Sequence, residues 1–271
     1  MKDLTGKVAL ITGSARGMGK LTAVNFAREG SRVVLTDLDQ EELQKATAEL
    51  KDAGYDVYSY VLDISDRDAC FKLVEQVEAE VGPIDVLVNN AGIATNETVL
   101  ETSEEQYRRI TDVNYLGQVW MMQAAVPGMV KRGSGHVVNM CSMAGKVAAC
   151  NLGPYCATKF AFIGITDAIR QELKGSGVEF TIVNPGYIGT GMFEGAKVPY
   201  VTRWLDPQKV SDALLVAVKK NKGEIFVPNF LGRLAAFARG LCLPKFVDAN
   251  FAILGADKSF GSMQKERGRP F

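Results

Sequence analysis

Two hydrophobic patterns alternate along the chain. Short runs that are apolar on both faces are typical of buried parallel strands, and stretches with apolar residues three and four positions apart are typical of amphipathic helices. The predicted strands are Val8–Ile11, Arg32–Thr36, Val57–Val61, Val86–Asn89, His136–Asn139, Glu179–Val183 and Glu224–Val227. The predicted helices are Lys20–Glu29, Gln40–Ala53, Arg67–Val81, Ser103–Met129 and Tyr155–Lys174.

This alternation predicts an α/β fold with a doubly wound, seven-stranded parallel sheet and helices on both faces. Ligands of such sheets bind at the carboxyl ends of the strands. We expect residues 1–228 to form one domain, because no linker or repeat divides them. Residues 229–271 are expected to form an apolar, helical C-terminal extension that packs on this domain or on a partner subunit.

Composition and charge narrow the function classes. The 271 residues include 31 basic and 31 acidic side chains, so the chain lacks the net positive charge that favours nucleic-acid binding. The five Cys are odd in number and contain no C-x-x-C pair, which argues against a disulfide framework and against a zinc or other metal site. The chain reaches its first strand within a few residues of Met1, which leaves no room for a signal peptide, and we expect a cytoplasmic protein.

A glycine-rich loop, Thr12-Gly-Ser-Ala-Arg-Gly-Met-Gly19, connects the first strand to the first helix. Glycines permit a tight turn and a close approach of the backbone to a ligand, and the helix N-terminus offers N–H groups to a pyrophosphate. A turn without a ligand is the alternative interpretation of a lone loop. The strand–loop–helix context predicts a Rossmann-type dinucleotide site with contacts from Gly13, Ser14, Arg16, Gly17, Met18 and Gly19.

Asp37 ends the second strand, about 20 residues beyond the loop, where a carboxylate accepts hydrogen bonds from the adenosine ribose. It would repel a 2′-phosphate, which favours NAD over NADP. Arg16 argues the other way, because a guanidinium pairs with phosphate, and we give Asp37 the greater weight. Asp63 and Ile64 follow the third strand, where they would meet the adenine ring. For both aspartates, capping of the next turn or helix is the alternative.

A second group of polar residues belongs to the same edge of the predicted sheet. Tyr155 and Lys159 are four residues apart and therefore share one face of a helix. Ser142 follows the fifth strand, and Asn114 lies in the long helix before it. The edge thus collects a phenol, an ammonium, a hydroxyl and an amide.

Six motifs now follow one another along about the first 230 residues. They are Thr12-Gly-x-x-x-Gly-x-Gly19, Asn89-Asn-Ala-Gly92, Asn114, Ser142, Tyr155-x-x-x-Lys159 and Pro185-Gly-x-x-x-Thr190. In this order and at these spacings they resemble the short-chain dehydrogenase/reductase family. The resemblance implies that Tyr155 is the general acid/base, Lys159 binds the nicotinamide ribose, Ser142 holds the substrate oxygen and Asn114 supports a proton-relay water. It also implies that the nicotinamide half of the cofactor is lined by Asn90, Ala91, Gly92, Tyr155, Lys159, Pro185, Gly186, Ile188 and Thr190.

The chemistry of alcohol oxidation needs a base, and a free phenol with a pKa near 10 is a poor one at neutral pH. The Lys159 ammonium and the oxidised nicotinamide would both favour the phenolate, and a lowering of about three units corresponds to roughly 4 kcal/mol. An exposed helix pair is the alternative for Tyr155 and Lys159, and a turn residue for Ser142. His136, the only histidine, is expected to be structural.

The segment of about residues 187–205 is apolar and follows Pro185, so we expect it to close over the nicotinamide as a lid. The facing stretch, Met143–Leu152, is also largely apolar and has no Arg to bind a carboxylate or phosphate. A lipophilic substrate, steroid-, retinoid- or long-chain-like, is therefore expected, and a lid that packs only on its own domain is the alternative. The predicted substrate contacts are Met143, Leu152, Tyr187, Met192, Phe193 and Trp204.

The C-terminal stretch 230–254 is apolar but interrupted by Arg233, Arg239, Lys245 and Asp248, which is too much charge for a membrane span. We rank three uses for it: packing on a partner subunit, roofing the substrate mouth, and peripheral contact with a membrane surface. The lid and this stretch more loosely resemble the retinol and 17β-hydroxysteroid dehydrogenase branch of the family. Membership of the family would also imply a homodimer or homotetramer.

Three functions remain in competition. The first is an NAD-dependent oxidoreductase that interconverts a lipophilic alcohol and its ketone or aldehyde. The second is an NADPH-dependent 3-oxoacyl-thioester reductase, which Arg16 favours and Asp37 opposes. The third is a non-catalytic NAD-binding regulator or scaffold, which has no need of the four polar residues Asn114, Ser142, Tyr155 and Lys159.

Overall fold

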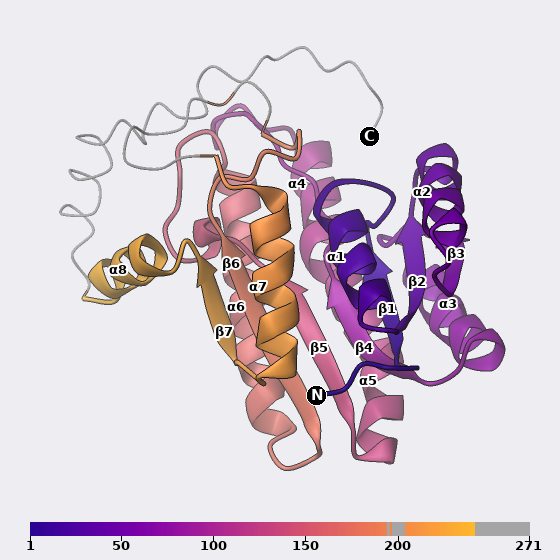
Figure 1. Ribbon diagram of the computed structural model, residues 1–271. Coiled ribbons are helices and arrows are strands. Elements are labelled where there is room, and N and C mark those ends of the chain that lie inside the picture. Colours follow the sequence, from indigo (N-terminus) through magenta and orange to yellow (C-terminus); the bar gives the residue numbers. More distant parts are fainter. Residues whose placement is uncertain (194–195, 197–203, 242–271) are drawn as a thin grey trace.

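The computed structural model describes residues 1–193, 196 and 204–241. In this part of the chain seven parallel strands form one sheet in the order β3-β2-β1-β4-β5-β6-β7 (Figure 1). They are β1 (Val8–Thr12), β2 (Arg32–Asp37), β3 (Val57–Val61), β4 (Ile84–Asn89), β5 (Gly135–Met140), β6 (Val178–Pro185) and β7 (Glu224–Val227). The prediction of a doubly wound, seven-stranded Rossmann-type sheet is confirmed.

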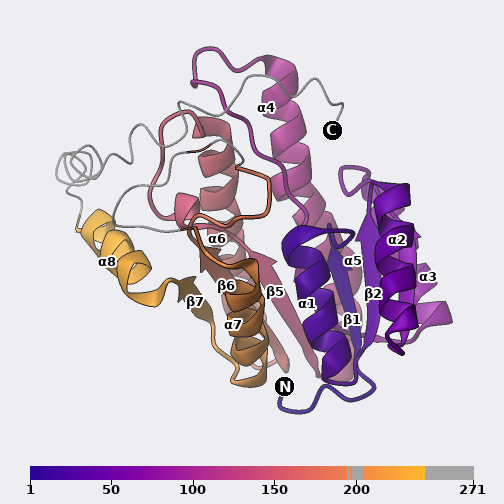
Figure 2. The same cartoon turned by 45° about the horizontal axis from the view of Figure 1, so that its top comes forward.

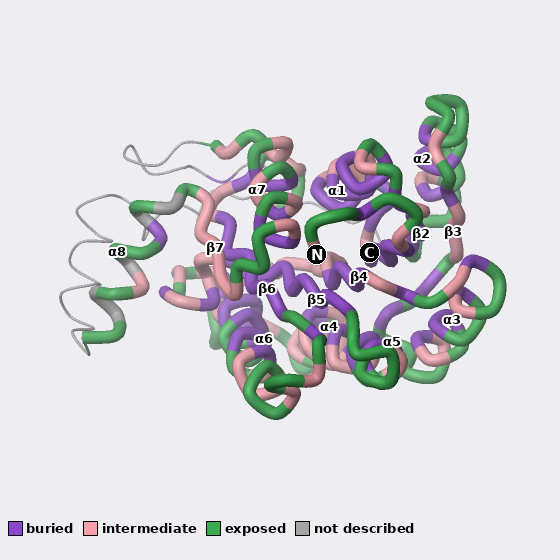
Figure 3. Tube along the Cα trace, turned by 60° about the horizontal axis from the view of Figure 1, so that its bottom comes forward, coloured by how far each residue is buried: buried purple, intermediate pink, exposed green. Residues whose placement is uncertain are grey.

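Helices cover both faces of the sheet, with α1, α2 and α7 on one face and α3 to α6 on the other (Figure 3). The helices are α1 (Gly17–Arg28), α2 (Gln40–Asp52), α3 (Arg67–Glu80), α4 (Glu104–Thr111), α5 (Gly117–Arg132), α6 (Gly153–Glu172), α7 (Pro207–Lys219) and α8 (Asn229–Gly240). One continuous helix was expected over Ser103–Met129. The structure instead has α4, a π-helical turn η1 (Asp112–Leu116) and α5. Helix α7 was not predicted.

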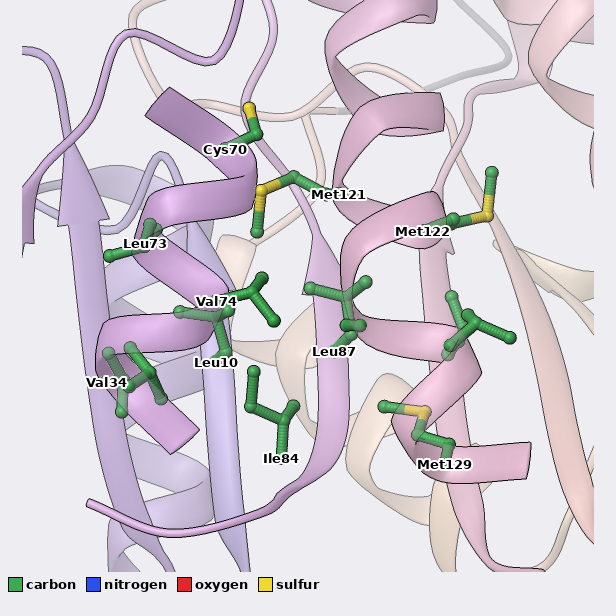
Figure 4. Close-up of a cluster of buried hydrophobic side chains, with 14 of the residues drawn as sticks. Leu10, Val34, Cys70, Leu73, Val74, Ile84, Leu87, Met121, Met122 and Met129 are labelled. Atoms are coloured by element: carbon green, nitrogen blue, oxygen red, sulfur yellow. The ribbon is translucent and has the colours of Figure 1, made fainter. Parts of the chain in front are cut away.

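Two buried clusters hold the layers together. In one, Leu73 and Val74 of α3 and Met121 of α5 pack on Leu10 and Leu87 of the sheet (Figure 4). The opposite cluster joins the sheet to α1, α2 and α7. Full burial of one such side chain contributes about 1.5–3 kcal/mol, so the hydrophobic strands favour a sheet with both faces covered.

Helix α8 lies outside β7, the edge strand of the sheet (Figures 1 and 2). A Cβ on Gly232 would lie 2.7 Å from Phe226 Cδ1 and 2.9 Å from Met143 Sδ, so α8 packs closely on β7 and on the segment after β5. Within the described residues, no helix has the length and apolar character needed to cross a bilayer. Residues 242–271 of the predicted extension lie outside the described residues.

His136 is buried in β5, as expected for a structural residue. Its Nε2 lies 2.8 Å from Thr181 Oγ1. The Thr181 hydroxyl donates its proton to Lys222 O, so Nε2–H of His136 must be the donor to Thr181. His136 Nδ1 is buried without a hydrogen-bond partner. The ring is therefore neutral, and burial, with a smaller contribution from the chain's N-terminal charge, lowers its pKa to about 4.

This burial predicts an acid-sensitive fold. The unfolded chain binds a proton at His136 near pH 6.5 and the folded chain near pH 4, so stability is lost as the pH falls through that window. In His136→Gln, the fall in the free energy of unfolding between pH 7 and pH 4 should be smaller by about 3 kcal/mol. Urea unfolding of both proteins at the two pH values measures this difference. An equal fall in the two proteins would contradict the neutral assignment.

Candidate active site

The carboxyl ends of the strands, at the top of Figure 1 and brought forward in Figure 2, carry the predicted site residues. The glycine-rich loop follows β1, and Asn90 to Gly92 follow β4. Ser142 follows β5, and Gly186 to Thr190 follow β6. Helix α6 carries Tyr155 and Lys159.

The glycine-rich loop is packed backbone to backbone against its neighbours. A Cβ on Gly13 would lie 2.7 Å from Ala91 Cα, and one on Gly19 would lie 2.2 Å from Gly13 O. Gly13 also has φ of +62°, a conformation that favours glycine. Gly17 faces Thr190, whose Cβ would be 3.6 Å from an added methyl group. The loop therefore has the close packing that a pyrophosphate-binding turn requires.

The N-terminus of α1 is open to an anion. Helices α2, α3, α4 and α7 each have an N-cap side chain that accepts a backbone N–H. The N-cap of α1 is Arg16, which makes no such bond. Helix N-terminal N–H groups without an acceptor bind phosphate well, so the loop and helix fit the pyrophosphate of a dinucleotide.

Asp37 connects the loop to the end of β2. Its Oδ2 accepts the backbone N–H of Ala15 at 3.0 Å, and its Oδ1 accepts that of Asp39 at 3.2 Å. The carboxylate is therefore fixed beside the loop and also stabilises the next turn. Arg16 is exposed, and no carboxylate in the described part of the chain pairs with it.

Asp63 and Ile64 have different environments. The exposed Asp63 accepts hydrogen bonds from Ser65 N at 2.9 Å and Ser65 Oγ at 2.6 Å, so it stabilises the turn before α3. Ile64 is buried, and its carbonyl oxygen would lie 2.5 Å from a Cβ on Gly117 of α5. The N-cap of α3 is Asp66, so Asp63 does not cap the next helix, which was the alternative given for it.

Asn90 joins the end of β4 to the glycine-rich loop. Its Nδ2 donates to Thr12 O and Gly13 O, both at 2.9 Å. Thr12 Oγ1 in turn accepts the backbone N–H groups of Asn90 and Ala91 at 3.0 Å. The Asn90 side chain therefore acts within the loop, and the segment that it stabilises would line the nicotinamide.

Asn114 lies in the π-helical turn, and its side chain bonds to Ile93, which follows Asn90 in the segment after β4. Its Oδ1 accepts Ile93 N–H at 2.8 Å, and its Nδ2 donates to Ile93 O at 2.8 Å. A Cβ on Gly92 would lie 3.3 Å from Asn114 Oδ1 and 3.8 Å from Lys159 Nζ. Asn114, Gly92 and Lys159 thus come together, as the sequence predicted.

Ser142, Tyr155 and Lys159 are all buried at this edge of the sheet. The side chain of Ser142 lies beside the Tyr155 phenol and lowers its pKa. Lys159 Nζ donates to Met140 O at 2.9 Å and lies 5.6 Å from the centroid of the Tyr155 ring. The hydroxyl, phenol and ammonium therefore form one compact group.

Burial sets the protonation of Tyr155 in the nucleotide-free chain. It raises the pKa of Tyr155 above its usual value of 10, and the neighbouring Ser142 side chain opposes this only in part. Burial also lowers the pKa of Lys159. The Lys159 ammonium donates to a backbone carbonyl. The predicted lowering of the Tyr155 pKa applies to the site with the oxidised nicotinamide bound, so it stays a prediction. Tyr155 is therefore a neutral phenol in the nucleotide-free chain.

Apolar side chains form a wall around Tyr155. The ring of Phe193 meets that of Tyr155 edge to face, with centroids 5.8 Å apart, and Leu152 is buried in the same cluster. Tyr187 packs against this cluster and meets Trp204 edge to face at 6.4 Å. The other members are Ile93, Ala94, Ile110, Ala144, Ala149, Cys156 and Ala196.

The remaining predicted substrate residues lie farther out. Met192 and Trp204 are 39% and 43% exposed, so both face outward in part. Met143 is half-buried beneath Gly232 of α8. Of the predicted lid, residues 194, 195 and 197–203 lie outside the described residues. Ile188 is buried, and its segment pairs with Leu205.

Known proteins share this sequence and fold. A model of the short-chain dehydrogenase family matches residues 7–198. The chain belongs to that family. Rat 17-beta-hydroxysteroid dehydrogenase 13 is 36% identical over 235 residues, which cover 85% of this chain and 77% of the relative. Mouse epidermal retinol dehydrogenase 2 is 35% identical over 236 residues, with 85% and 76% covered.

Solved structures agree with this assignment. A gluconate 5-dehydrogenase from Burkholderia cenocepacia, in complex with NADP and tartrate, matches with a TM-score of 0.77 and 26% identity, covering 83% of this chain and 95% of that chain. The present chain, a short-chain dehydrogenase, is thus an NAD(P)-dependent alcohol dehydrogenase or ketoreductase that acts on CH–OH groups. The relatives also confirm the resemblance to the retinol and 17β-hydroxysteroid dehydrogenase branch.

Two residues of this short-chain dehydrogenase gain roles that sequence reasoning missed. Thr12 was part of the loop motif, but its hydroxyl group had no assigned function. Gln118 was not singled out, although an uncharged polar residue on the buried face of a predicted helix is a detectable signal. Both hold the segment between β4 and α4, because their side chains bond to its backbone.

Proposed function

We propose that the chain is an NAD-dependent oxidoreductase that interconverts a lipophilic alcohol and its ketone or aldehyde, with Tyr155 as the general acid/base. One observation carries this proposal: the buried Tyr155 phenol, with the side chain of Ser142 beside it, lies within an apolar wall. A substrate whose hydroxyl or carbonyl group meets this polar pair would place its neighbouring atoms against the apolar wall. The geometry therefore favours substrates with one reactive oxygen on a hydrocarbon body.

Each polar residue has a defined task in this proposal. Ser142 binds the substrate oxygen, and Tyr155 donates a proton to that oxygen in reduction or accepts one from it in oxidation. The neutral state of Tyr155 is the one required of the acid. The nicotinamide, when bound, supplies or takes the hydride. Lys159 and Asn114 bind the nicotinamide ribose and a relay water in the role that the family resemblance implies.

The relatives support the substrate class. They are named as dehydrogenases of 17-beta-hydroxysteroids and of retinol, both of which are bulky apolar alcohols. The same class follows from the wall of Leu152, Tyr187 and Phe193, because a polar substrate would lose hydration there without gaining hydrogen bonds. Gluconate, a polar acid, is the substrate named for the solved neighbour.

Turnover with and without the phenol tests this function. Nicotinamide absorbance should report oxidation of steroid, retinoid or long-chain alcohols, with little turnover of polyols or sugar acids of the same size. Tyr155→Phe should lower kcat by 10³-fold or more, an order-of-magnitude expectation for loss of the proton-transfer group. Nucleotide affinity and melting temperature serve as controls and should not change. Most of the activity surviving in Tyr155→Phe, or 3-oxoacyl thioesters outperforming every alcohol, would overturn the proposal.

The preference for NAD rests on Asp37. Its carboxylate is fixed beside the loop by Ala15 and Asp39, so it cannot turn away from a 2′-phosphate without losing both bonds. The side chain of Arg16 is exposed, so binding the 2′-phosphate would cost it more conformational entropy than the already fixed Asp37 side chain loses. The NADP bound to the solved neighbour belongs to a different enzyme and leaves the preference of this chain to experiment.

We expect kcat/KM to be at least about 10-fold higher with NAD than with NADP, which corresponds to about 1.4 kcal/mol. Both nucleotides should be titrated against one alcohol in parallel. In Asp37→Ser the ratio should move toward NADP, whereas Arg16→Ser should move it further toward NAD. A preference for NADP in the unmodified chain would show that Arg16 dominates.

The exposed face of α8 supports the expected self-association. Phe230, Leu234, Phe237 and Leu241 follow a helical spacing, and all are more than half exposed, with Phe230 at 76%. Such a face is costly in water. It lies beside the edge strand β7, where a second copy of the chain would cover it.

Light scattering tests this contact. The chain should have the mass of a dimer or tetramer, and Phe237→Asp should reduce it, because a carboxylate would be buried in the contact. Leu100→Asp is the matched control, since Leu100 is also exposed but far along the chain from α8. A monomeric chain that floats with liposomes, and loses flotation on Phe237→Asp, would contradict self-association and favour the membrane alternative.

A further inference from the structure

Gln118 is an uncharged polar residue buried near the start of α5. Only 1% of its surface is exposed, and its neighbours on the buried face of α5 include Met121, Met122 and Ala125. Burial of an amide is costly unless hydrogen bonds replace those made to water. The partners of Gln118 therefore indicate why an amide occupies this position.

The first partner lies in the π-helical turn. Gly117 N–H donates to Asp112 O, five residues back. In an α-helix the same N–H would bond to Val113 O, so the π-helical turn deprives Val113 O of that donor. Gln118 Nε2 donates to Val113 O at 3.2 Å. The amide thus supplies a donor to the carbonyl from which the π-helical turn withdraws Gly117 N–H.

The second partner lies at the active site. Gln118 Nε2 donates to Ala91 O at 2.7 Å. Both partners are carbonyl oxygens, which can only accept, so the NH₂ end of the amide must face them. Its Oε1 is buried without a partner. The residue is therefore used for its two donors, and these connect the π-helical turn to the segment after β4.

We propose that Gln118 is a positioning residue: it holds the π-helical turn against Ala91 so that Asn114 and Gly92 stay beside Lys159. Asn114 bonds to both backbone groups of Ile93, two residues after Ala91. The side-chain amides of Asn114 and Gln118, one helical turn apart, therefore both bond to the backbone of the short segment from Ala91 to Ile93. The catalytic consequence rests on the function proposed above, but the structural link does not.

Hydrogen–deuterium exchange of the nucleotide-free chain tests the structural link. Gln118→Met keeps the side-chain length and removes both donors. It should speed exchange in peptides that cover residues 90–95 and 112–118 by about 10-fold or more, which corresponds to loss of about one hydrogen bond. Peptides from β2, α2 and α7 should be unaffected. Gln123→Met is the matched control, since Gln123 is exposed on the same helix. Unchanged exchange in both peptides would overturn the proposal.

Kinetics then separate positioning from general destabilisation. Gln118→Met should lower kcat on the order of 10–100-fold with little change in nucleotide affinity, because displacing a site residue by about 1 Å has an effect of this size. Gln118→His, which keeps a ring N–H near Nε2, should restore part of the rate. In an Asn114→Ala background, Gln118→Met should lower kcat only slightly further, because both substitutions remove hydrogen bonds that support the same backbone segment.

The opposite results overturn the proposal. Additive losses in the double variant, or a loss of kcat that follows the melting temperature and is not relieved by Gln118→His, would make Gln118 a structural residue only. These outcomes are distinguishable from failure of the proposed function. If the unmodified chain turns over and Tyr155→Phe does not, the function stands whichever way Gln118 behaves.

Discussion

The site depends on a close contact between backbones at the carboxyl ends of β1 and β4. Gly13 lies so near to Ala91 that a methyl group would overlap its Cα, and a methyl group on Gly19 would lie even closer to Gly13 O. Side chains cannot separate these strands, so hydrogen bonds from Thr12 and Asn90 can reach across. The glycine-rich loop and the segment of residues 90–92 are therefore packed and hydrogen-bonded together, and Asn114 and Lys159 lie against this unit.

The segment after β4, which packs on the glycine-rich loop, is also held by side chains of the π-helical turn and of α5. Asn114 and Gln118 bond to the backbone on either side of Gly92, and Thr158 of α6 lies 3.3 Å from Asn114 Nδ2. Thr158 in turn donates to the carbonyl of Tyr155. A continuous set of hydrogen bonds thus runs from the glycine-rich loop to the helix that carries the phenol. Rigid support of this kind holds reacting groups within the narrow geometry that catalysis needs.

Much of this arrangement could be predicted from sequence because it depends on short-range patterns. Apolar runs with both faces hydrophobic predicted all seven strands, and motif spacing brought Asn114, Ser142, Tyr155 and Lys159 to one edge. The π-helical turn could not be predicted, because one extra residue in a turn hardly changes an apolar spacing of three and four. The sequence can mark Gln118 as a polar residue on a buried helix face, but it does not indicate that its partner is Ala91, 27 positions away.

The burial of Tyr155 could not be predicted from sequence, for a different reason. The sign of a pKa shift depends on the balance between burial and nearby charge, and sequence indicates which charges are near but not how deeply a group is buried. Lys159 was correctly placed one turn from Tyr155, yet its ammonium bonds to Met140 O, and the phenol is enclosed by Phe193 and Leu152. The apolar wall on which the proposed lipophilic substrate would pack therefore also raises the pKa of Tyr155. The proposed substrate class and the raised pKa both depend on this wall, so a change that opens the wall would alter both together.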